Sequence, residues 1–344
     1  MEYDINKDIR AVDALLNDKS PVLLVTHINP DGDAIGSTMA MYHYLKKKGN
    51  KVWAMTPNDF PQFLAWVEAS SDIIIFQKNK ELAQAVIAEA KYIICIDFNG
   101  YARLKELGPL LEAANAMKVL IDHHPQPDNG FIYKIHDTKA PATAQLVFKF
   151  IKESGNIELL DKTIATCIYT GMMTDTGVFS YNINNSETFR VIADLLDAGI
   201  DRDLIYDNVF NNFSHHRMRL MGYCLNEKMV VLPHLHAAYI WLTKKEMEKF
   251  SFETGDTEGF VNMPFAIKGI NITALFTEKH DHVRVSMRSR GEFDVNKVCL
   301  KYFSGGGHKN AAGGESKAPI KEVIKEFEKI LESYRNEIQC FYHN

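Results

Sequence analysis

The sequence predicts an α/β protein: a parallel-sheet N-terminal domain, a helical linker and a smaller α+β C-terminal domain. Short apolar runs alternate with helical patterns in the first half of the chain, and near residue 229 the pattern changes to alternating strands. The length, 344 residues, is about twice that of a typical domain. We therefore expect the domain boundaries 1–200, 201–228 and 229–344.

Five buried strands are predicted in the N-terminal domain, each a short apolar run typical of a sheet covered on both faces. They cover residues 21–26, 51–55, 72–76, 92–96 and 118–121. Helices are predicted between them, for example at 34–48, just before Gly49, and at 80–90. Because ligands of such sheets bind beyond the carboxyl ends of the strands, polar residues at those ends are the first candidates for function.

The rest of the chain completes the predicted architecture. Residues 141–198 have mainly helical patterns, and residues 201–228, which are polar and lack proline, predict one stiff linker helix. In the C-terminal domain we expect strands and then a closing amphipathic helix. The strands are placed at 230–243, 270–277 and 283–288, and the helix at 320–334.

Composition and charge exclude several classes of protein. A hydrophobic content of 46% is that of a globular chain, not a disordered or fibrous one. Five widely spaced cysteines without a CxxC pair predict reduced thiols rather than disulfides or a cysteine-ligated zinc site. The sequence lacks a secretory signal and any apolar run of about 18 residues, so we expect a cytoplasmic protein.

The net charge of −5 argues against a protein that coats long nucleic acid. The charge is uneven, however, because residues 229–344 hold 16 Lys and Arg against 15 Asp and Glu. Within 284–309 there are six basic residues and two acidic ones. This basic segment suggests a small anionic ligand, although a solvated run of charges is the ordinary alternative.

A possible metal-binding segment follows the first predicted strand. His27, Asp31 and Asp33 lie within seven residues, around a tight turn that Pro30 and Gly32 favour. Imidazole and carboxylate groups so close together can bind a metal ion. Asp33 as a helix N-cap and Asp31 as a turn former are the alternative.

Two further strands deliver polar residues to the same edge of the sheet. Asp97 ends the fourth strand, Asp122-His123-His124 ends the fifth, and Asp175 follows a helical pattern at 163–173. Buried carboxylates repel one another unless cations neutralise them. Two divalent ions would balance the four carboxylates of Asp31, Asp33, Asp97 and Asp175, with His27 and His123 completing the coordination. Such a dinuclear site, with ions about 3.5–4 Å apart, is a common device for phosphoryl hydrolysis.

These motifs resemble those of a known superfamily. His27-x-x-x-Asp31-x-Asp33, Asp97, Asp122-His123-His124 and Thr174-Asp175-Thr-Gly resemble the four motifs of the DHH phosphoesterases. Gly305-Gly-Gly-His308-Lys-Asn-Ala-Ala-Gly313 resembles the glycine-rich signature of the DHH-associated C-terminal domain. Together the motifs span nearly the whole chain, in the order and at the strand ends that the superfamily requires.

The resemblance implies two divalent metal ions, manganese by analogy, with Asp97 bridging them. The first ion is expected on His27, Asp31 and Asp97. The second is expected on Asp33, Asp97, His123 and Asp175. The catalytic residues would be His124, facing the scissile phosphate, and Asp122, which orients its neighbours.

Substrate-binding residues are expected mainly in the C-terminal domain. Three glycines, Gly305, Gly306 and Gly307, let backbone N–H groups approach an anion, although a flexible turn is the alternative. His308 and Arg288 favour phosphate binding, since a guanidinium can hold a phosphate through two hydrogen bonds. Strand geometry places Arg284 and Ser286 on the face of Arg288. Arg103 matches a frequent arginine of the superfamily, with a structural salt bridge as the alternative.

The second domain narrows the expected substrate. Family II pyrophosphatases lack the glycine signature, RecJ-like exonucleases are longer, and membrane-anchored cyclic-dinucleotide phosphodiesterases carry transmembrane and sensory segments. The bare two-domain chain resembles the bifunctional nanoRNases and 3′-phosphoadenosine-5′-phosphate (pAp) phosphatases. This resemblance implies that a metal-bridging hydroxide hydrolyses short oligoribonucleotides to 5′-mononucleotides, and pAp to AMP and phosphate. We expect the protein to bind these substrates, and to bind neither a membrane nor long duplex nucleic acid.

The alternatives that stay open are a RecJ-like single-strand DNA exonuclease, a phosphodiesterase acting on linear or cyclic dinucleotides, and a nucleotide-binding sensor without catalysis.

Overall fold

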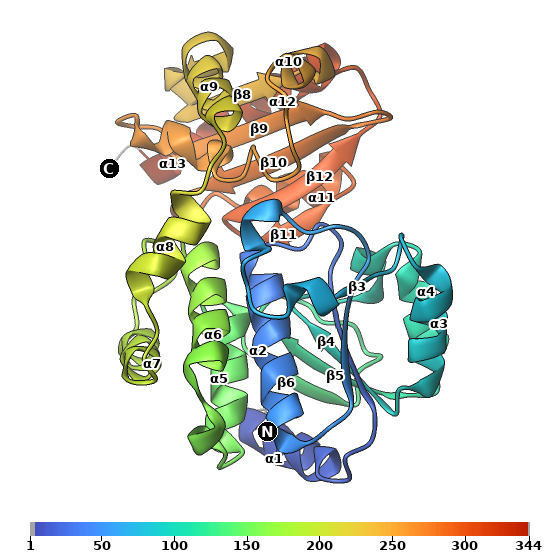
Figure 1. Cartoon of the computed structure of the whole chain (residues 1–344). Coiled ribbons are helices and arrows are strands. Elements are labelled where there is room, and N and C mark those ends of the chain that lie inside the picture. Colours follow the sequence, from blue (N-terminus) through green and yellow to red (C-terminus); the bar gives the residue numbers. More distant parts are fainter. Residues whose placement is uncertain (1–3, 343–344) are drawn as a thin grey trace. The chain divides into compact units, whose positions relative to one another are not determined.

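The computed structural model describes residues 4–342 and divides into two compact units, residues 1–212 and 213–344 (Figure 1). The boundary between the units falls inside the segment expected to be a linker. The first unit is built on a parallel sheet and the second on a mixed sheet with helices, so the predicted fold class is confirmed.

The sheet of the first unit has six parallel strands in the order β3-β2-β1-β4-β5-β6. The strands are β1 (Val22–Thr26), β2 (Val52–Thr56), β3 (Ile74–Ile75), β4 (Tyr92–Ile96), β5 (Met117–Asp122) and β6 (Tyr133–His136). All five predicted strands are present, although β3 is only two residues long. Strand β6 was missed because it is a short edge strand in which only Ile135 is buried.

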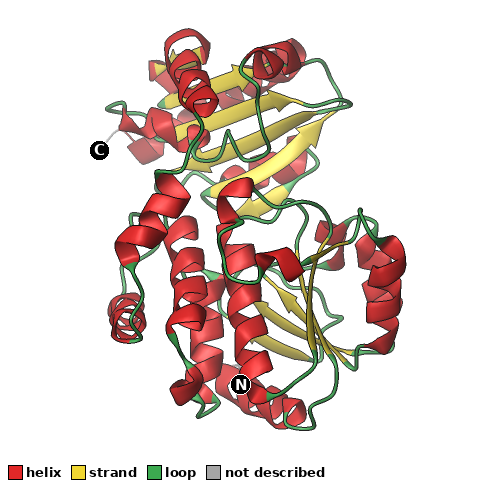
Figure 2. Cartoon of the chain, in the orientation of Figure 1, coloured by secondary structure: helices red, strands yellow, loops and turns green. Residues whose placement is uncertain are grey.

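Helices cover both faces of this sheet (Figures 1 and 2). They are α1 (Ile5–Leu16), α2 (Gly32–Lys48), α3 (Lys80–Glu89), α4 (Leu107–Ala113), α5 (Thr143–Glu153), α6 (Lys162–Asp175), α7 (Ser186–Asp197) and α8 (Arg202–Phe210). Helices α2, α5 and α6 lie on one face, and α3 and α4 lie on the other. The strands alternate between the two cores: Ile94 packs on the first side, and Ile93 and Cys95 pack on the second.

Helices α2 and α6 approach each other closely because glycines lie at their contact. A Cβ atom on Gly36 would lie 2.6 Å from the carbonyl oxygen of Cys167, and one on Gly171 would lie 2.7 Å from the Cβ of Ala144 on α5. Both distances are shorter than real Cβ contacts, so neither position accepts a side chain without movement. This packing brings the start of α2 next to the end of α6.

The sheet of the second unit also has six strands, in the order β11-β12-β10-β9-β8-β7. They are β7 (Met229–Leu232), β8 (Ala237–Leu242), β9 (Ile272–Glu278), β10 (Val283–Ser289), β11 (Gly306–His308) and β12 (Ala311–Ser316). Only β8 and β9 pair in parallel. The single strand expected at 230–243 is wrong: a 3₁₀ turn at Pro233–Leu235 and His236, with a φ of 49°, divide it into β7 and β8.

The helices of the second unit also pack on both sides of its sheet. They are α9 (His215–Tyr223), α10 (Lys244–Lys249), α11 (Val295–Tyr302), α12 (Ile320–Ser333) and α13 (Arg335–Tyr342). Phe327 of α12 and Ile338 of α13 belong to one core, whereas Leu220 of α9 and Met247 of α10 belong to the other. The amphipathic helix predicted at 320–334 is confirmed as α12, but it does not close the chain, because α13 follows it.

The linker is not one helix, so that prediction is wrong. Helix α8 ends at Phe210, α9 begins at His215, and a π-helical turn, Cys224–Lys228, follows directly. The side chain of Ser214 accepts a hydrogen bond from the backbone N–H of Arg217 and so starts a new helix. The Arg217 guanidinium packs 3.4 Å from the ring centroid of Phe213 and donates to the carbonyl of Glu258. Helix α9 is thus fixed to the second unit.

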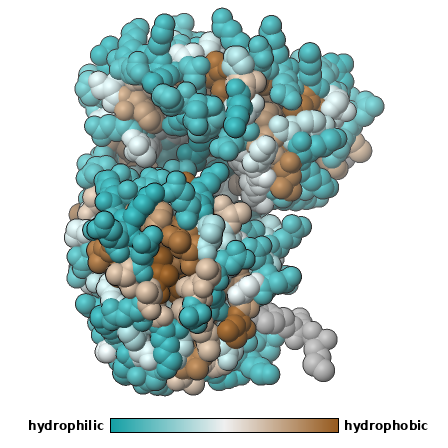
Figure 3. Space-filling model, turned by 90° about the vertical axis from the view of Figure 1, so that its right-hand side faces the viewer, coloured by the Kyte–Doolittle hydropathy of each residue, from teal (hydrophilic) through white to brown (hydrophobic). Residues whose placement is uncertain are grey.

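The polarity of the surface and the state of the cysteines agree with what the composition predicts. Figure 3 shows a mostly hydrophilic face on which apolar residues gather in limited groups. No helix among the described residues is long and apolar enough to cross a membrane. The five cysteines are free thiols, four of them buried and Cys340 exposed, as predicted.

Candidate metal centre

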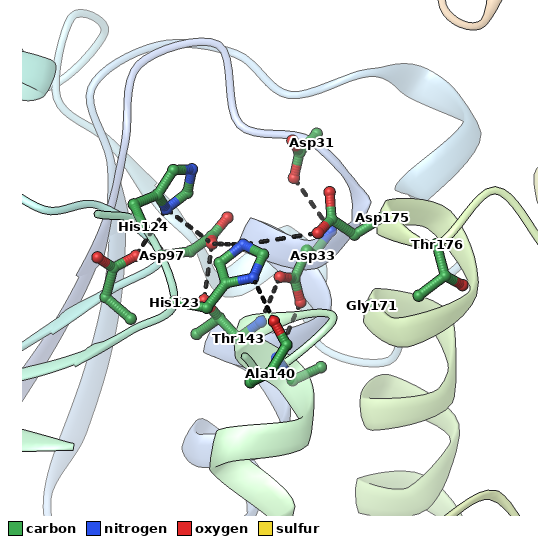
Figure 4. Close-up of polar contacts among 12 residues, drawn as sticks. Asp31, Asp33, Asp97, His123, His124, Ala140, Thr143, Gly171, Asp175 and Thr176 are labelled. Carbon is green, nitrogen blue, oxygen red and sulfur yellow. Dashed lines mark hydrogen bonds and ion pairs between the residues drawn. The ribbon is translucent and has the colours of Figure 1, made fainter. Parts of the chain in front are cut away.

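The carboxyl ends of three neighbouring strands bring the predicted ligands to one edge of the first sheet. His27 directly follows β1, Asp97 directly follows β4, and Asp122 is the last residue of β5. Asp175 reaches the same place as the last residue of α6. Figure 4 shows the side chains of Asp97, His123 and Asp175 converging from separate elements.

The turn after β1 presents two carboxylates in different ways. Asp31 is the N-cap of α2, and its Oδ1 accepts the backbone N–H groups of Asp33 and Ala34, each at 3.1 Å. Asp33 lies in the first turn of the helix and is only 1% exposed. The capping role that we considered for Asp33 therefore belongs to Asp31, which leaves Asp33 pointing into the protein.

One set of ligand atoms comes from His27, Asp31 and Asp97, whose donor atoms all lie within 4.8 Å of one another. Nδ1 of His27 lies 2.8 Å from the carbonyl oxygen of Ile28, so this nitrogen carries the proton. Nε2 is then left as the ligand atom and lies 3.4 Å from Oδ2 of Asp97. A backbone carbonyl that fixes one imidazole nitrogen is the usual support for a metal-binding histidine.

A second set comes from Asp33, His123 and Asp175, again within 4.8 Å. Nδ1 of His123 lies 3.0 Å from the carbonyl oxygen of Ala140, which orients the ring as Ile28 orients His27. Nε2 of His123 lies 3.5 Å from Oδ2 of Asp175. The residues of these two groups are those expected from the sequence, which also placed Asp97 in the second set; their binding of cations stays a prediction.

Asp97 lies between the two sets. Its Oδ2 faces Nε2 of His27, whereas its Oδ1 lies 3.8 Å from Nε2 of His123. The residue has a φ of 65°, a left-handed conformation that few side chains other than Asn and Asp adopt readily. One oxygen directed at each set is an arrangement by which a carboxylate can bridge two cations.

The charges of this cluster are poorly balanced within the protein. Burial, together with the nearby Asp97 and Asp175, raises the pKa of Asp33 well above its ordinary value. Burial also acts to raise the pKa of Asp97, but the surrounding imidazoles, His27 first among them, outweigh it and hold that pKa low. His123 is buried, which disfavours its charge, yet the carboxylates around it raise its pKa to about 9. Divalent cations would relieve this repulsion, so the donor set fits bound metal ions.

His124 and Asp122 form a pair beside the ligand sets, and with Asp97 they make a further group whose donor atoms lie within 4.8 Å of one another. Nδ1 of His124 lies 2.7 Å from Oδ1 of Asp122, which is fully buried at the end of β5. On the other side, Nε2 of His136 lies 2.7 Å from the carbonyl oxygen of His124. Burial is the main cause that lowers the pKa of His124, and the charge of Arg103 adds to it. Arg103 is therefore close enough to act on this site electrostatically.

Two of the three glycines of the second unit's glycine-rich segment, Gly306 and Gly307, lie in an edge strand, β11, and so do not form the flexible turn considered as the alternative. A Cβ atom on Gly305 would lie 1.9 Å from the carbonyl oxygen of Gly313, and Gly307 has a φ of 150°. The close approach of β12 is thus one reason for glycine at these positions. The expected binding of an anion by this backbone stays a prediction.

Arg288 and His308 share one face of the second sheet. Both pair with Ala311 of β12, so they form one row across β10, β12 and β11. The neighbouring row consists of Ser286, Gly313 and Gly306. Strands lie about 4.8 Å apart, so about 10 Å separates the two polar residues of the first row across a surface of small residues.

Comparison with known proteins assigns the chain to a family. Residues 21–172 match the DHH family, N-terminal domain, and residues 234–337 match the DHHA1 domain. A relative from Thermus thermophilus, named bifunctional oligoribonuclease and PAP phosphatase NrnA, is 30% identical over 324 residues, covering 93% of this chain and 91% of its own. The chain belongs to the DHH family. The membership predicted from the motifs is confirmed.

Two other similar proteins extend this result. A Bacillus subtilis protein with the same name is 26% identical over 298 residues, covering 85% of this chain and 88% of its own. The crystal structure of an exopolyphosphatase-related protein from Bacteroides fragilis is 40% identical, with a TM-score of 0.92, covering 97% of this chain and 98% of that one. The two-unit architecture is therefore shared over almost the full length.

The motifs predicted the candidate ligand residues, but not the residues that hold them in place. Thr143, at the start of α5, bonds to both Asp33 and Asp97, and His136 of β6 supports His124. In sequence, a threonine before a helical pattern indicates a helix cap. Nothing in the sequence indicated that Thr143 would contact Asp33 and Asp97, which lie 110 and 46 residues before it. His136 was missed together with its strand.

Proposed function

We propose that this DHH protein is a phosphoester hydrolase that uses two divalent cations, manganese by analogy, at the cluster around Asp97. The proposed substrates are short oligoribonucleotides, cleaved to 5′-mononucleotides, and pAp, cleaved to AMP and phosphate. The observation that carries the proposal is the pair of three-residue ligand sets with the two oxygens of Asp97 directed one to each. The names of the Thermus and Bacillus relatives support the choice of substrates.

The residues of the chain would divide the work between binding cations and moving a proton. His27, Asp31 and Asp97 hold one cation, and Asp33, His123 and Asp175, with Asp97 shared, hold the other. When bound, such a pair lowers the pKa of water to near neutrality and neutralises charge on the phosphoryl group. Asp122 accepts from Nδ1 of His124, and its charge partly offsets the burial that lowers the pKa of this ring; in the protonated ring Nε2 would donate a proton to the leaving oxygen.

The second unit would bind the part of the substrate that does not react. Arg288 and His308, in one row over a floor of small residues, can take a terminal phosphate. Backbone N–H groups of Gly305, Gly306 and Gly307 would contribute further donors, and Arg103 would contribute charge near His124. A protein with a net charge of −5 lacks the excess of positive charge that gives affinity for a long nucleic acid, which supports a substrate of a few nucleotides. A cytoplasmic location remains a prediction from the sequence.

The test compares substrates side by side in the presence of Mn²⁺, with products separated by chromatography. The substrates are a 5′-phosphorylated RNA dinucleotide, pAp, pyrophosphate and long single-stranded DNA. Inorganic polyphosphate is the fifth, because the similar Bacteroides fragilis protein is described as exopolyphosphatase-related. We expect mononucleotides from the dinucleotide and AMP from pAp, with little product from the other three.

Two variants separate chemistry from binding in the same assay. Asp97→Ala should abolish turnover of every substrate, because it removes a ligand from both sets, whereas Arg288→Ala should mainly raise KM. Turnover by Asp97→Ala at the rate of the unmodified protein would contradict the dinuclear site. If DNA, pyrophosphate or polyphosphate is turned over fastest, the proposed metal site is still supported, but the proposed substrates are wrong. Bound metal without turnover of any phosphoester would instead support a nucleotide-binding sensor.

A further inference from the structure

Thr143 contacts the carboxylates of both ligand sets. Its backbone N–H donates to Oδ2 of Asp33 at 2.6 Å, and its side-chain hydroxyl donates to Oδ1 of Asp97 at 2.8 Å (Figure 4). Asp33 belongs to the set with His123, whereas Asp97 belongs to the set with His27. Thr143 itself is fully buried. A single residue therefore joins the two halves of the proposed centre.

The hydroxyl of Thr143 is available for this contact because it is not needed to accept the first backbone N–H groups of α5. The N-cap of α5 is Ala142, which has no side-chain acceptor. Asp33, from α2, accepts the first backbone N–H groups instead, with Oδ2 on Thr143 and Oδ1 on Ala144 at 2.9 Å. Ser37 donates to the same Oδ1 at 3.0 Å. The helix end and the carboxylate thus hold each other in place.

The bond from Thr143 selects one orientation of Asp97. The hydroxyl binds Oδ1, the oxygen on the His123 side, and so leaves Oδ2 directed at Nε2 of His27. Without the hydroxyl the carboxylate could rotate about its Cβ–Cγ bond, because its positive-φ backbone does not fix the side chain. The orientation needed for a bridge is therefore set from outside the ligand shell.

We propose that Thr143 is a positioning residue that couples the two cation sites, by orienting the shared Asp97 through its hydroxyl and Asp33 through its backbone. The inference rests on the proposed two-cation site. Loss of the hydroxyl should lower the affinity for cations without removing any ligand. Changes in the groups that support metal ligands typically cost about 10–100-fold in affinity or activity.

The experiment titrates the full-length protein with Mn²⁺ by calorimetry and follows the bound ions by electron paramagnetic resonance. Thr143→Val keeps the shape and the backbone N–H but removes the hydroxyl, and Thr143→Ser restores the hydroxyl. Thr188→Val is the matched control, because Thr188 is also fully buried and its hydroxyl binds Gln145 rather than a ligand. We expect Thr143→Val to weaken binding of at least one Mn²⁺ by about 10–100-fold. The spectrum should shift from a coupled pair towards isolated ions.

The outcomes separate this inference from the proposed function. If the unmodified protein binds fewer than two Mn²⁺ ions, the proposed site itself fails. If it binds two and Thr143→Val does so with the same affinities and spectrum, the role of Thr143 is wrong. Thr143→Ser should bind like the unmodified protein, and failure of this rescue would also contradict the proposal. If Thr143→Val does not fold, Thr143→Ala, compared with Thr143→Ser, gives the same test.

Discussion

Asp33 shows how one buried carboxylate can serve both the fold and the site. Its two oxygens accept three hydrogen bonds, from Ser37, Thr143 and Ala144, while the same group faces His123 and Asp175. Asp31, two residues earlier, also caps a helix, but it uses one oxygen for two N–H groups. The two residues should therefore respond differently to the same substitution.

Asp33→Asn should destabilise the protein and weaken Mn²⁺ binding together. The amide must direct its NH₂ group at a backbone N–H donor of α5, and an unsatisfied buried polar group costs about 1–3 kcal/mol, from which the lost repulsion by Asp97 and Asp175 subtracts. Asp31→Asn should weaken Mn²⁺ binding alone, because asparagine is as good an N-cap as aspartate. Urea unfolding without metal and Mn²⁺ titration, carried out on both variants, measure the two effects. Equal losses of unfolding free energy in both variants would show that Asp33 has no special structural role.

At the scale of single residues, the sequence predicted the candidate metal ligands but not the residues that hydrogen-bond to them. Spacing around Pro30 and Gly32, and the strand ends before Asp97 and Asp122, were enough to place donor atoms together. The bond between Thr143 and Asp97 depends on how α5 docks on the sheet, which no local pattern encodes. Hydrogen bonds between distant elements are consequences of packing, so they appear only in the folded chain.

Among the elements, the contact of α2 with α6 controls the distance between Asp33 and Asp175. Gly171 of α6 faces both α5 and α2: its Cβ would lie 2.7 Å from Cβ of Ala144 and 2.8 Å from Oδ1 of Asp33. Gly222 of α9 is also a helical glycine, but nothing lies within 4 Å of its Cβ position. These two glycines allow a controlled comparison of the same substitution.

Gly171→Ala should lower the free energy of unfolding by about 1–3 kcal/mol, the usual range for overpacking a core. It should also weaken Mn²⁺ binding, because the added methyl group displaces Asp33. Gly222→Ala should be neutral or stabilising by up to about 1 kcal/mol, since alanine is the better helix former. Chemical unfolding of both variants provides the measurement. A Gly171→Ala variant as stable as the unmodified protein would mean that α2 and α6 can separate without loss.

Elements were predicted well where they are buried and poorly where they are edges or connections. The four central strands of the first sheet, β1, β2, β4 and β5, were predicted correctly because they are mainly apolar. Strand β11, with three residues of which two are glycine, carries no apolar pattern, and its pairing with β12 depends on backbone approach. The break between α8 and α9 rests on Ser214 and Arg217, which look like ordinary polar helix residues in sequence.

At the scale of the whole molecule, each unit has its own hydrophobic cores and its own buried polar network. All the proposed metal ligands belong to the first unit. In the second unit, Glu246 accepts hydrogen bonds from Lys228, Tyr223 and Thr243, while the Lys228 ammonium lies 2.9 Å from the ring centroid of Trp241. Burial opposes the charge of Glu246, but these donors outweigh it and lower its pKa to about 2.

The two networks predict separate responses to metal and to acid. Because a ligand that binds only the folded state stabilises it, Mn²⁺ should raise the midpoint of one thermal transition, that of the first unit. Glu246→Gln should lower only the other transition at pH 7. Since the pKa of Glu246 is depressed in the folded protein, its contribution is present above about pH 4.5 and is lost as the pH falls towards 2. The difference between Glu246→Gln and the unmodified protein should therefore shrink below pH 4.5.

Differential scanning calorimetry at pH 7 and pH 3, with and without Mn²⁺, measures all of these shifts. A single transition that Mn²⁺ and Glu246→Gln both move would show that the two units unfold as one.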